Sequence, residues 1–187
     1  MKIDKNFKIF VKKKIYIFKK IELREVNKDY IKSLSFARYL NKKKKYTIRL
    51  QKKYLQNIEK KKRSFILGFF NKKKLLGTMG CQLHKKIIVG KKKYYNSASF
   101  GVLVFSKFRN KKLGQLMVTS FSKILREFFD IKLIFINIHP NNSVSKKIFI
   151  NSSFVFVKRG RQREYYFLKK KITNKNYRNI KIRSEVI

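Results

Sequence analysis

The stretch that decides the fold runs from Val102 to Leu116 and reads VLVFSKFRNKKLGQL. Its first four residues are apolar and include two β-branched valines, which is typical of a strand buried on both faces. From Leu113 onward, apolar residues recur every three or four positions, which predicts a helix of about five turns ending near Phe129. A short basic turn therefore joins a buried strand to the start of a helix.

This basic turn has the properties of an anion-binding site. The backbone N–H groups of a first helical turn have no partners within the helix, and the helix dipole places partial positive charge there. Gly114 would let the backbone approach a ligand closely, and the cations Arg109, Lys111 and Lys112 suit a pyrophosphate. The alternative is an ordinary turn in which Gly114 only eases packing and water surrounds the cations.

A second polar segment follows the next buried strand, Leu133 to Ile138. Pro140 and two asparagines open a short helix there, and Asn142 and Ser145 lie three residues apart, hence on one helical face. Open α/β sheets bind ligands at the carboxyl edge of their strands, where both side chains could hydrogen-bond a ligand lying in a split between strands. The commoner role of an asparagine here is that of a helix cap.

Together, and in this order, the two segments resemble the GNAT superfamily of acetyltransferases. The acetyl-CoA signature of that family, Gln/Arg-x-x-Gly-x-Gly/Ala at a strand-to-helix turn, reads RNKKLG from Arg109 to Gly114. A later signature combines Asn-x-x-Ala/Ser, an aliphatic–aromatic pair and a closing Gly-Phe. Here it reads NSVS from Asn142, IF from Ile148 and SF from Ser153. The ordered pair is more specific than either motif alone.

The resemblance spans roughly residues 21 to 170 and implies one α/β domain. That fold has a mixed, mostly antiparallel twisted sheet, helices on both faces and a splayed pair of parallel strands, here Ala98 to Phe105 and Leu133 to Ile138. By the same resemblance, the protein would transfer an acetyl group from acetyl-CoA to a primary amine. Residues 1 to 20 would be a basic N-terminal extension, and residues 171 to 187 a basic, frayed tail.

The resemblance also implies roles for individual residues. Backbone groups of the strand would bind the pantetheine arm, amides of the turn would hold the pyrophosphate, and Asn142 would hold the pantetheine. In branches resembling the ribosomal-protein alanine acetyltransferases, a serine three residues after that asparagine protonates the departing thiolate, and Ser145 matches it. The implied acetyl-CoA site comprises Val102, Val104, Arg109, Lys111, Lys112, Leu113, Gly114, Gln115, Asn142 and Ser145.

Three positions depart from the family pattern. Lys112 stands where the signature has its first glycine, so the turn must reach the phosphates without glycine's freedom at positive φ. Phe149 replaces the tyrosine that many relatives use as general acid, which moves that role to Ser145 or to no residue. Ser153 replaces the closing glycine. A decayed GNAT fold that binds acyl-CoA without turnover is therefore an alternative.

The group that accepts a proton from the incoming ammonium is harder to place in so basic a chain. His139 ends the strand beside the expected cleft, and imidazole is the usual base at neutral pH, so His139 is the candidate. His84 ranks below it. Three carboxylates are expected to form salt bridges with neighbouring lysines: Glu22, Glu25 and Glu164.

The charge balance is extreme, because 51 Lys and Arg residues oppose 9 Asp and Glu, giving a formal net charge of +42. Such a field attracts phosphate-rich partners, so a non-catalytic RNA- or ribosome-binding protein is the alternative from another functional class. Compositional drift is the other explanation, since Lys, Ile, Asn, Phe and Tyr are the residues that A+T-rich codons produce. The lysines form scattered runs rather than one face, and the strands are long and apolar, so nucleic-acid binding is possible but not favoured.

No segment reaches the roughly 20 apolar residues of a membrane-spanning helix, and the start lacks the apolar core of a signal peptide. A cytoplasmic protein without a membrane span is therefore expected. Cys81 is the single cysteine and should pack as a small hydrophobe. With the two histidines it makes too poor a set for structural zinc, so no metal is expected.

The remaining pattern predicts further strands and helices. It indicates a strand from Ile21 to Val26, a helix capped by Asn27 or Asp29, and a second helix capped by Thr47. It also indicates a hairpin of Ser64–Phe70 with Leu75–Leu83. A final strand pair is expected from Phe154–Val157 with Tyr165–Leu168. The two helices resemble the acceptor-side helices of GNAT branches that acetylate protein N-termini or amino sugars. We expect an amino sugar or another small amine as acceptor, a protein N-terminus as the alternative, and a monomer or homodimer.

Overall fold

The computed structural model describes residues 5–35, 46–89, 92–168 and 180–186. Its strands are β1 (Lys5–Val11), β2 (Lys14–Lys20), β3 (Ser64–Asn71), β4 (Lys74–Val89), β5 (Lys92–Val104), β6 (Leu133–Ile138), β7 (Phe154–Arg159), β8 (Glu164–Leu168) and β9 (Lys181–Val186). Within these ranges they form one nine-stranded sheet in the order β7-β8-β6-β5-β4-β3-β2-β1-β9. The predicted mixed α/β class and the predicted hairpin of β3 with β4 are confirmed.

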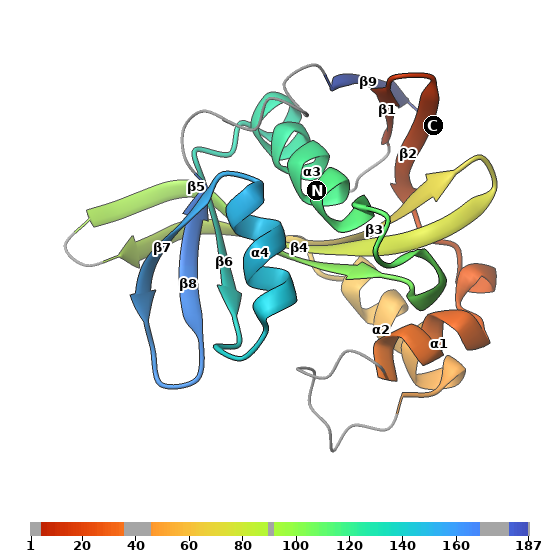
Figure 1. Ribbon diagram of the computed structural model, residues 1–187, viewed down its shortest axis with the longest axis horizontal. Helices are drawn as coiled ribbons and strands as arrows, with labels where there is room; N and C mark the ends of the chain where they lie inside the picture. The colour runs from red at the N-terminus through yellow and green to blue at the C-terminus, as the bar shows by residue number, and fades with distance from the viewer. Residues whose placement is uncertain (1–4, 36–45, 90–91, 169–179, 187) are drawn as a thin grey trace.

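Helices cover both faces of this sheet (Figure 1). They are α1 (Lys28–Ser35), α2 (Ile48–Glu59), α3 (Leu113–Phe129) and α4 (Ser143–Asn151), with single 3-10 turns η1 (Leu23–Glu25) and η2 (Ser106–Phe108). The predicted cap Thr47 is confirmed, because its Oγ1 accepts the N–H of Leu50 at 3.2 Å. None of the helices in the described ranges is long and apolar enough to cross a membrane.

The main core lies between the sheet and α3. Phe121, in the middle of that helix, is fully buried and contacts the rings of Phe18 and Phe100 at centroid distances of 5.7 and 5.2 Å. Cys81 is buried in the same core, as expected, and its burial raises the pKa of its thiol. A smaller cluster lies on the opposite face, where α1 and α2 pack over the carboxyl end of β5 through Tyr30, Leu55 and Phe105.

The predicted splayed pair is confirmed. β5 and β6 run parallel from Ser97 opposite Leu133 to Ser99 opposite Phe135, and their pairing ends there. Beyond that point β6 pairs with β8, while β5 continues beside β4 as far as Val104. The other strand pairs that the structure describes are all antiparallel. The two central strands therefore part at their carboxyl ends.

The strand predicted from Ile21 to Val26 is wrong, because the strand ends at Lys20 and the turn η1 follows. The cause is local: Glu22 and Glu25 form a reciprocal capping box, in which the N–H of Glu22 donates to Glu25 Oε2 at 2.7 Å. This turn buries Ile21 and Val26 beneath α1 and α2.

Both ends of the chain contribute strands to the sheet. Residues 5 to 20, predicted as an extension, form the hairpin of β1 and β2. Residues 181 to 186, predicted as part of a frayed tail, form β9, which pairs with β1. Ile182 lies opposite Ile9, and Lys8 Nζ lies 2.6 Å from Glu185 Oε1, so apolar and ionic cross-strand pairs hold this edge. The rest of that tail, residues 171 to 179 and 187, lies outside the described ranges.

Candidate functional site

The split between β5 and β6 exposes backbone groups of β5. The N–H of Phe105 donates to the carbonyl oxygen of Leu76 in β4 at 3.0 Å. Backbone groups alternate sides along a strand, so the N–H and C=O groups of Val104 and Val102 point away from β4. They face the side from which β6 has departed. The two valines expected to bind a pantetheine arm therefore present to the split backbone groups that pair with no neighbouring strand in the described residues.

Arg109 folds back from the basic turn onto this edge. Its Nε donates to the carbonyl oxygen of Val104 at 3.4 Å, and its side chain is otherwise exposed. The contact places a guanidinium group at the mouth of the split, beside the start of α3. An anionic ligand entering there would meet this charge first.

The start of α3 carries no side-chain cap among the described residues. In this it differs from α2, which Thr47 caps, and from α4, which Asn142 caps. The N–H groups of Leu113, Gly114 and Gln115 belong to the first turn, where no intrahelical acceptor exists. Combined with the dipole of a 17-residue helix, this end of α3 suits a phosphate.

Gly114 brings the start of α3 close to α4 and to the end of β5. A Cβ placed on Gly114 would lie 2.9 Å from Cδ1 of Ile148 and 3.5 Å from Cγ2 of Val104. Gln115 adds a tie between the helices, because its Nε2 donates to the carbonyl oxygen of Asn151 at 2.9 Å. The basic turn and the α4 segment, separate in the sequence, are thus neighbours. Gly114 serves the packing of the two helices, which was one of the two roles weighed for it.

Asn142 and Ser145 share a local bond at the start of α4. Asn142 Oδ1 accepts the N–H of Ser145 at 3.1 Å, so the asparagine caps the helix. The cap uses the side-chain oxygen and leaves the amide NH2 of Asn142 as the group that a ligand can engage. Both side chains are partly exposed.

Comparison with known proteins identifies this arrangement. No protein-family model and no curated protein matches the sequence. Three solved structures match it closely in shape. An uncharacterized protein from Bacillus halodurans has 13% identity and a TM-score of 0.75, and the match covers 92% of this chain and 94% of that one. Mycobacterium smegmatis RimJ, in complex with CoA-disulfide, has 11% identity and a TM-score of 0.68, with 93% of each chain covered. FdhC, described as a nucleotide-linked sugar GNAT, has 12% identity and a TM-score of 0.67, with 87% and 90% covered.

This chain has the GNAT fold. The resemblance that the two motifs indicate is therefore confirmed at the level of architecture, although sequence identity to these structures is low. The parted parallel strands and the turn into α3 occupy the positions that the GNAT signatures predict.

The two positions where this chain lacks a signature glycine keep the backbone shape that glycine adopts most easily. Lys112 has φ 56° and ψ 9°, and Ser153 has φ 70°, both in the left-handed region. A side chain there costs about 1 to 2 kcal/mol. The turn into α3 therefore retains a left-handed residue despite the lysine, and the chain bears the strain.

Replacing Lys112 by glycine should stabilise the protein by up to about 1 kcal/mol, because strain relief exceeds the greater freedom of glycine in the unfolded chain. Lys111→Gly is the matched control, since it removes the same charge at a residue outside the left-handed region. That control should destabilise the protein by about 0.5 to 1 kcal/mol. Urea unfolding of both variants measures the difference, and equal losses would show that Lys112 bears no strain.

His139, the expected base, and Phe149, at the position of the family's tyrosine, both contact residues that hold the fold together. His139 is partly buried, and its Nδ1 accepts the N–H of Asn141 at 3.2 Å within the turn that leads into α4. Phe149 is buried, with its ring 5.8 Å from that of Phe100 and 5.1 Å from that of Phe154. Phe149 is thus a core residue, and its position offers no proton donor.

Glu164 forms a buried ionic cluster that fixes α4 against the sheet. Its Oε2 lies 2.7 Å from Lys146 Nζ and accepts the Tyr166 hydroxyl at 2.9 Å, and its Oε1 accepts from Arg159 at 2.9 Å. The hydrogen bond from Lys146 is the main reason that the pKa of Glu164 falls to about 2. Burial, followed by the bond to Glu164, raises the pKa of Tyr166 to about 12. The predicted salt-bridge role of Glu164 is confirmed, and Lys146 directly follows Ser145.

The ionic cluster predicts a pH dependence. Because the pKa of Glu164 is lower in the folded chain than its ordinary value near 4.5, Glu164 stabilises the fold above that value. This contribution should disappear as the pH falls from about 4.5 to about 2. In urea unfolding at stepped pH, the wild type should exceed Glu164→Gln in stability at pH 7, and the gap should close toward pH 2. A gap that stays constant over this window would contradict the assignment; the other carboxylates are common to both proteins.

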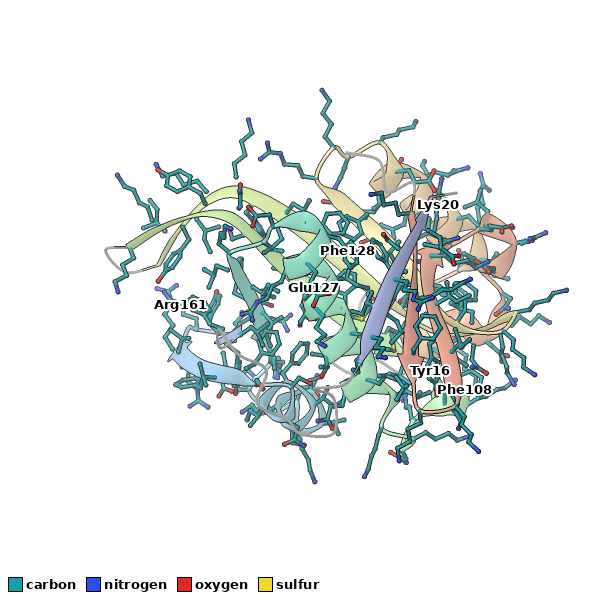
Figure 2. All side chains as sticks on the ribbon, turned by 90° about the horizontal axis from the view of Figure 1, so that it is seen from above. Tyr16, Lys20, Phe108, Glu127, Phe128 and Arg161 are labelled. Atoms are coloured by element: carbon teal, nitrogen blue, oxygen red, sulfur yellow. The ribbon has the colours of Figure 1, made fainter. Side chains whose placement is uncertain are left out.

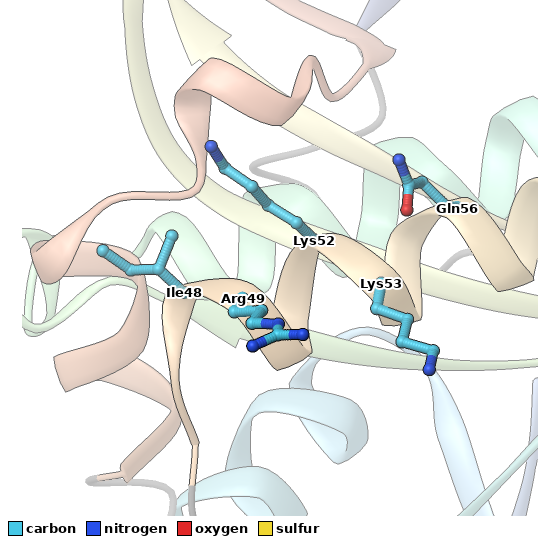
Figure 3. A pocket seen from close by; sticks show the side chains of 5 residues that line it. All are labelled: Ile48, Arg49, Lys52, Lys53 and Gln56. Carbon is cyan, nitrogen blue, oxygen red and sulfur yellow. The ribbon is translucent and has the colours of Figure 1, made fainter.

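A shallow, open depression lies along the exposed face of α2, and all of its lining residues belong to that helix. Figure 3 shows the five side chains that line it, Ile48, Arg49, Lys52, Lys53 and Gln56. Three of them are cationic and none is acidic. The sequence alone does not indicate this depression, because the residue pattern of α2 does not show which of its lysines lie together on the surface.

Cationic side chains also project around the rest of the molecule. Seen from above, nitrogen-tipped side chains surround the whole outline, from the side of Lys20 to the side of Arg161 (Figure 2). Some are paired, as in Lys107 with Asp29 at 2.8 Å and Lys20 with Glu59 at 3.2 Å. The positive field is therefore spread over the surface visible in this view.

Proposed function

We propose that this protein is an N-acetyltransferase that transfers an acetyl group from acetyl-CoA to a primary amine. One observation carries the proposal. β5 and β6 part after Ser99, and the uncapped start of α3 lies at the far end of the split between them. The outward groups of Val104 and Val102 bind the two amides of the pantetheine arm. The first-turn amides of α3, from Leu113 to Gln115, bind the pyrophosphate.

Three cations and one amide complete the coenzyme site. Arg109, Lys111 and Lys112 surround the start of α3 and neutralise the phosphate charges, since all three side chains are exposed there. The NH2 group of Asn142 donates to a pantetheine carbonyl while its oxygen continues to cap α4. The coenzyme thus joins α3, β5 and α4, which Gly114 and Gln115 already bring together.

The transfer itself needs two proton movements. The lone pair of the amine attacks the thioester carbon, the carbon–sulfur bond breaks, and the sulfur leaves as a thiolate. The Ser145 hydroxyl, one residue before the lysine that Glu164 anchors, donates a hydrogen bond to that thiolate and relays to it the second proton that the nitrogen loses as the amide forms. His139 is one candidate for the group that removes the proton from the ammonium.

An amino sugar carried on a nucleotide is the acceptor that the surface favours. Such a molecule brings phosphate groups, and the depression along α2 offers Arg49, Lys52 and Lys53 to them. FdhC, which shares the fold, is described as a nucleotide-linked sugar GNAT. A protein N-terminus has no phosphates and would leave these cations without a role in recognition.

Two measurements test this function. Isothermal titration calorimetry should detect binding of acetyl-CoA, and a thiol-release assay should then detect CoA with a panel of amines: a UDP-linked amino sugar, glucosamine, spermidine and a short peptide with a free N-terminus. We expect the UDP-linked amino sugar to react fastest. Absence of binding would reject the coenzyme site, binding without turnover would indicate a decayed enzyme, and faster reaction of the peptide would assign the protein to the N-terminal acetyltransferases.

A further inference from the structure

Three side chains meet at the point where β5 and β6 part. Nε2 of His84, in β4, lies 3.0 Å from Oγ of Ser99, in β5. The His84 ring centroid lies 5.2 Å from that of Phe135, in β6. Ser99 and Phe135 form the last pair of the parallel ladder. We call His84, Ser99 and Phe135 the His84 cluster.

The His84 cluster lies on the face of the sheet opposite α3. Phe100 packs against Phe121 of α3, so Ser99, its neighbour in β5, points to the other face. The same alternation holds in β6, where Ile134 and Ile136 belong to the core that includes α3 and Phe135 lies between them. The imidazole therefore stands on the side of the split that α3 does not cover.

This side is open in the described part of the chain. Near the His84 cluster, Gln82, Gly101 and Asn137 are exposed on the same face. The helices of this face, α1 and α2, pack further along, over Leu103 and Phe105. An amine can thus approach the parting strands from the His84 side, while α3 closes the other.

The position of the cluster along β5 matches the reactive end of the coenzyme. This step rests on the proposed function. If the two pantetheine amides pair with Val104 and Val102, the chain continues toward the amino end of β5, and the next positions of the ladder are Phe100 and Ser99. The thioester then lies where the strands converge, beside the hydroxyl of Ser99.

We propose that His84, acting through Ser99, is the base that removes the proton from the incoming ammonium. The Ser99 hydroxyl takes one proton from the ammonium and passes its own to Nε2 of His84, which frees the nitrogen lone pair to form the bond to the thioester carbon. The carbon–sulfur bond then breaks, and the second proton that the nitrogen loses goes to the departing thiolate, which leaves as the thiol of coenzyme A. Ser99 is unchanged at the end, and the imidazolium returns its proton to solvent.

The surroundings of His84 suit this task. Burial lowers the pKa of its imidazole, which favours the neutral ring that a base requires. Among the described residues, the imidazole has a polar contact with the hydroxyl of Ser99, at hydrogen-bond distance. His139 differs, because its Nδ1 accepts the N–H of Asn141 in a turn beyond the end of β6.

Nuclear magnetic resonance can test the placement without any acceptor. The chain has only two histidines, so its histidine ring protons give two sets of signals, which His139→Gln assigns. With acetyl-CoA labelled with ¹³C in the acetyl methyl group, we expect a nuclear Overhauser effect from that methyl to the His84 ring. Calorimetry on the same samples records whether the coenzyme is bound. Bound coenzyme with no effect at His84 would overturn the inference and leave the proposed function standing; no binding would reject the proposed function itself.

Variants then separate a base from a packing residue. With the fastest amine of the panel, His84→Gln should lower kcat/KM at least tenfold while acetyl-CoA affinity stays within twofold. Ser99→Ala should do the same, and Ser99→Thr, which keeps the hydroxyl, should restore most of the rate. Lys86→Gln, an exposed substitution two residues along β4, is the control that should leave the rate unchanged. Equal rates for wild type and His84→Gln would reject the role.

Discussion

Gly114→Glu is expected to weaken acetyl-CoA binding by at least a hundredfold, which is about 2.7 kcal/mol. Two effects add. A Cβ at residue 114 would lie 2.9 Å from Ile148 Cδ1, so the Ile148 side chain must shift and the longer glutamate side chain must find room between α3 and α4. The carboxylate would then place negative charge against the N–H groups that we assign to the pyrophosphate, and would repel the phosphates directly.

Gly160→Glu is the matched control for this variant. It adds the same side chain and the same charge in the turn between β7 and β8, where a Cβ would meet only the ring edge of Tyr165 at 3.2 Å and the carbonyl oxygen of Arg163 at 3.4 Å within 3.5 Å. Gly160 belongs to none of the segments assigned to the coenzyme, so acetyl-CoA affinity should change less than fivefold. Calorimetry decides between them, and Gly114→Ala, which needs only a small shift of the Ile148 methyl, serves if the glutamate variant does not fold. If Gly114→Glu bound acetyl-CoA as tightly as the wild type, the phosphate site would lie elsewhere.

The centre of the fold is predictable from local sequence. The apolar run through Val104 and the helical period of α3 define a strand and a helix without reference to distant residues. The structure confirms both, and it also confirms that β6 lies parallel to β5. The order of strand, basic turn and helix is a short-range pattern, which is why the elements that would hold the coenzyme could be predicted.

The edges of the sheet were less predictable because their signals depend on partners. β9 alternates charged and apolar residues and reads as a basic tail, yet Ile182 and Glu185 find Ile9 and Lys8 across the pair. The strand predicted from Ile21 to Val26 is the opposite case, because the capping box of Glu22 and Glu25 forms a turn there and ends the strand. In both cases the secondary structure depends on contacts between specific side chains and their partners, which the alternation of apolar and polar residues in one segment does not show.

The His84 cluster could not be found from sequence for a related reason. Its three members come from three strands, and only the register between those strands brings His84 next to Ser99 and Phe135. Backbone shape is similarly hidden: nothing in the local sequence shows that Lys112 keeps the left-handed conformation of a glycine. Sequence therefore predicts where the phosphates would bind, whereas the proposed side of amine approach depends on the register between strands.

Ser145→Ala is expected to lower kcat by roughly ten- to a hundredfold, equivalent to about 1.4 to 2.7 kcal/mol at the transition state, with acetyl-CoA affinity nearly unchanged. The reason begins with Phe149, which is buried among Phe100 and Phe154 and has no proton to donate. Ser145 is partly exposed at the first turn of α4, a helix that contacts the start of α3 through Ile148 and Asn151. Its hydroxyl can stabilise the sulfur as negative charge develops there, an interaction that the intact thioester does not need.

Steady-state kinetics with the best amine of the panel, beside calorimetry of acetyl-CoA, distinguish the possible roles of Ser145. The backbone N–H of residue 145 donates to Asn142 Oδ1, and alanine keeps this cap, so the start of α4 should survive the substitution. Loss of turnover alone therefore reports the hydroxyl. Unchanged kcat would remove Ser145 from the mechanism, because a thiolate can leave without a proton donor. Equal losses of kcat and affinity would instead make the hydroxyl a contact to the bound coenzyme, present before the reaction as well as during it.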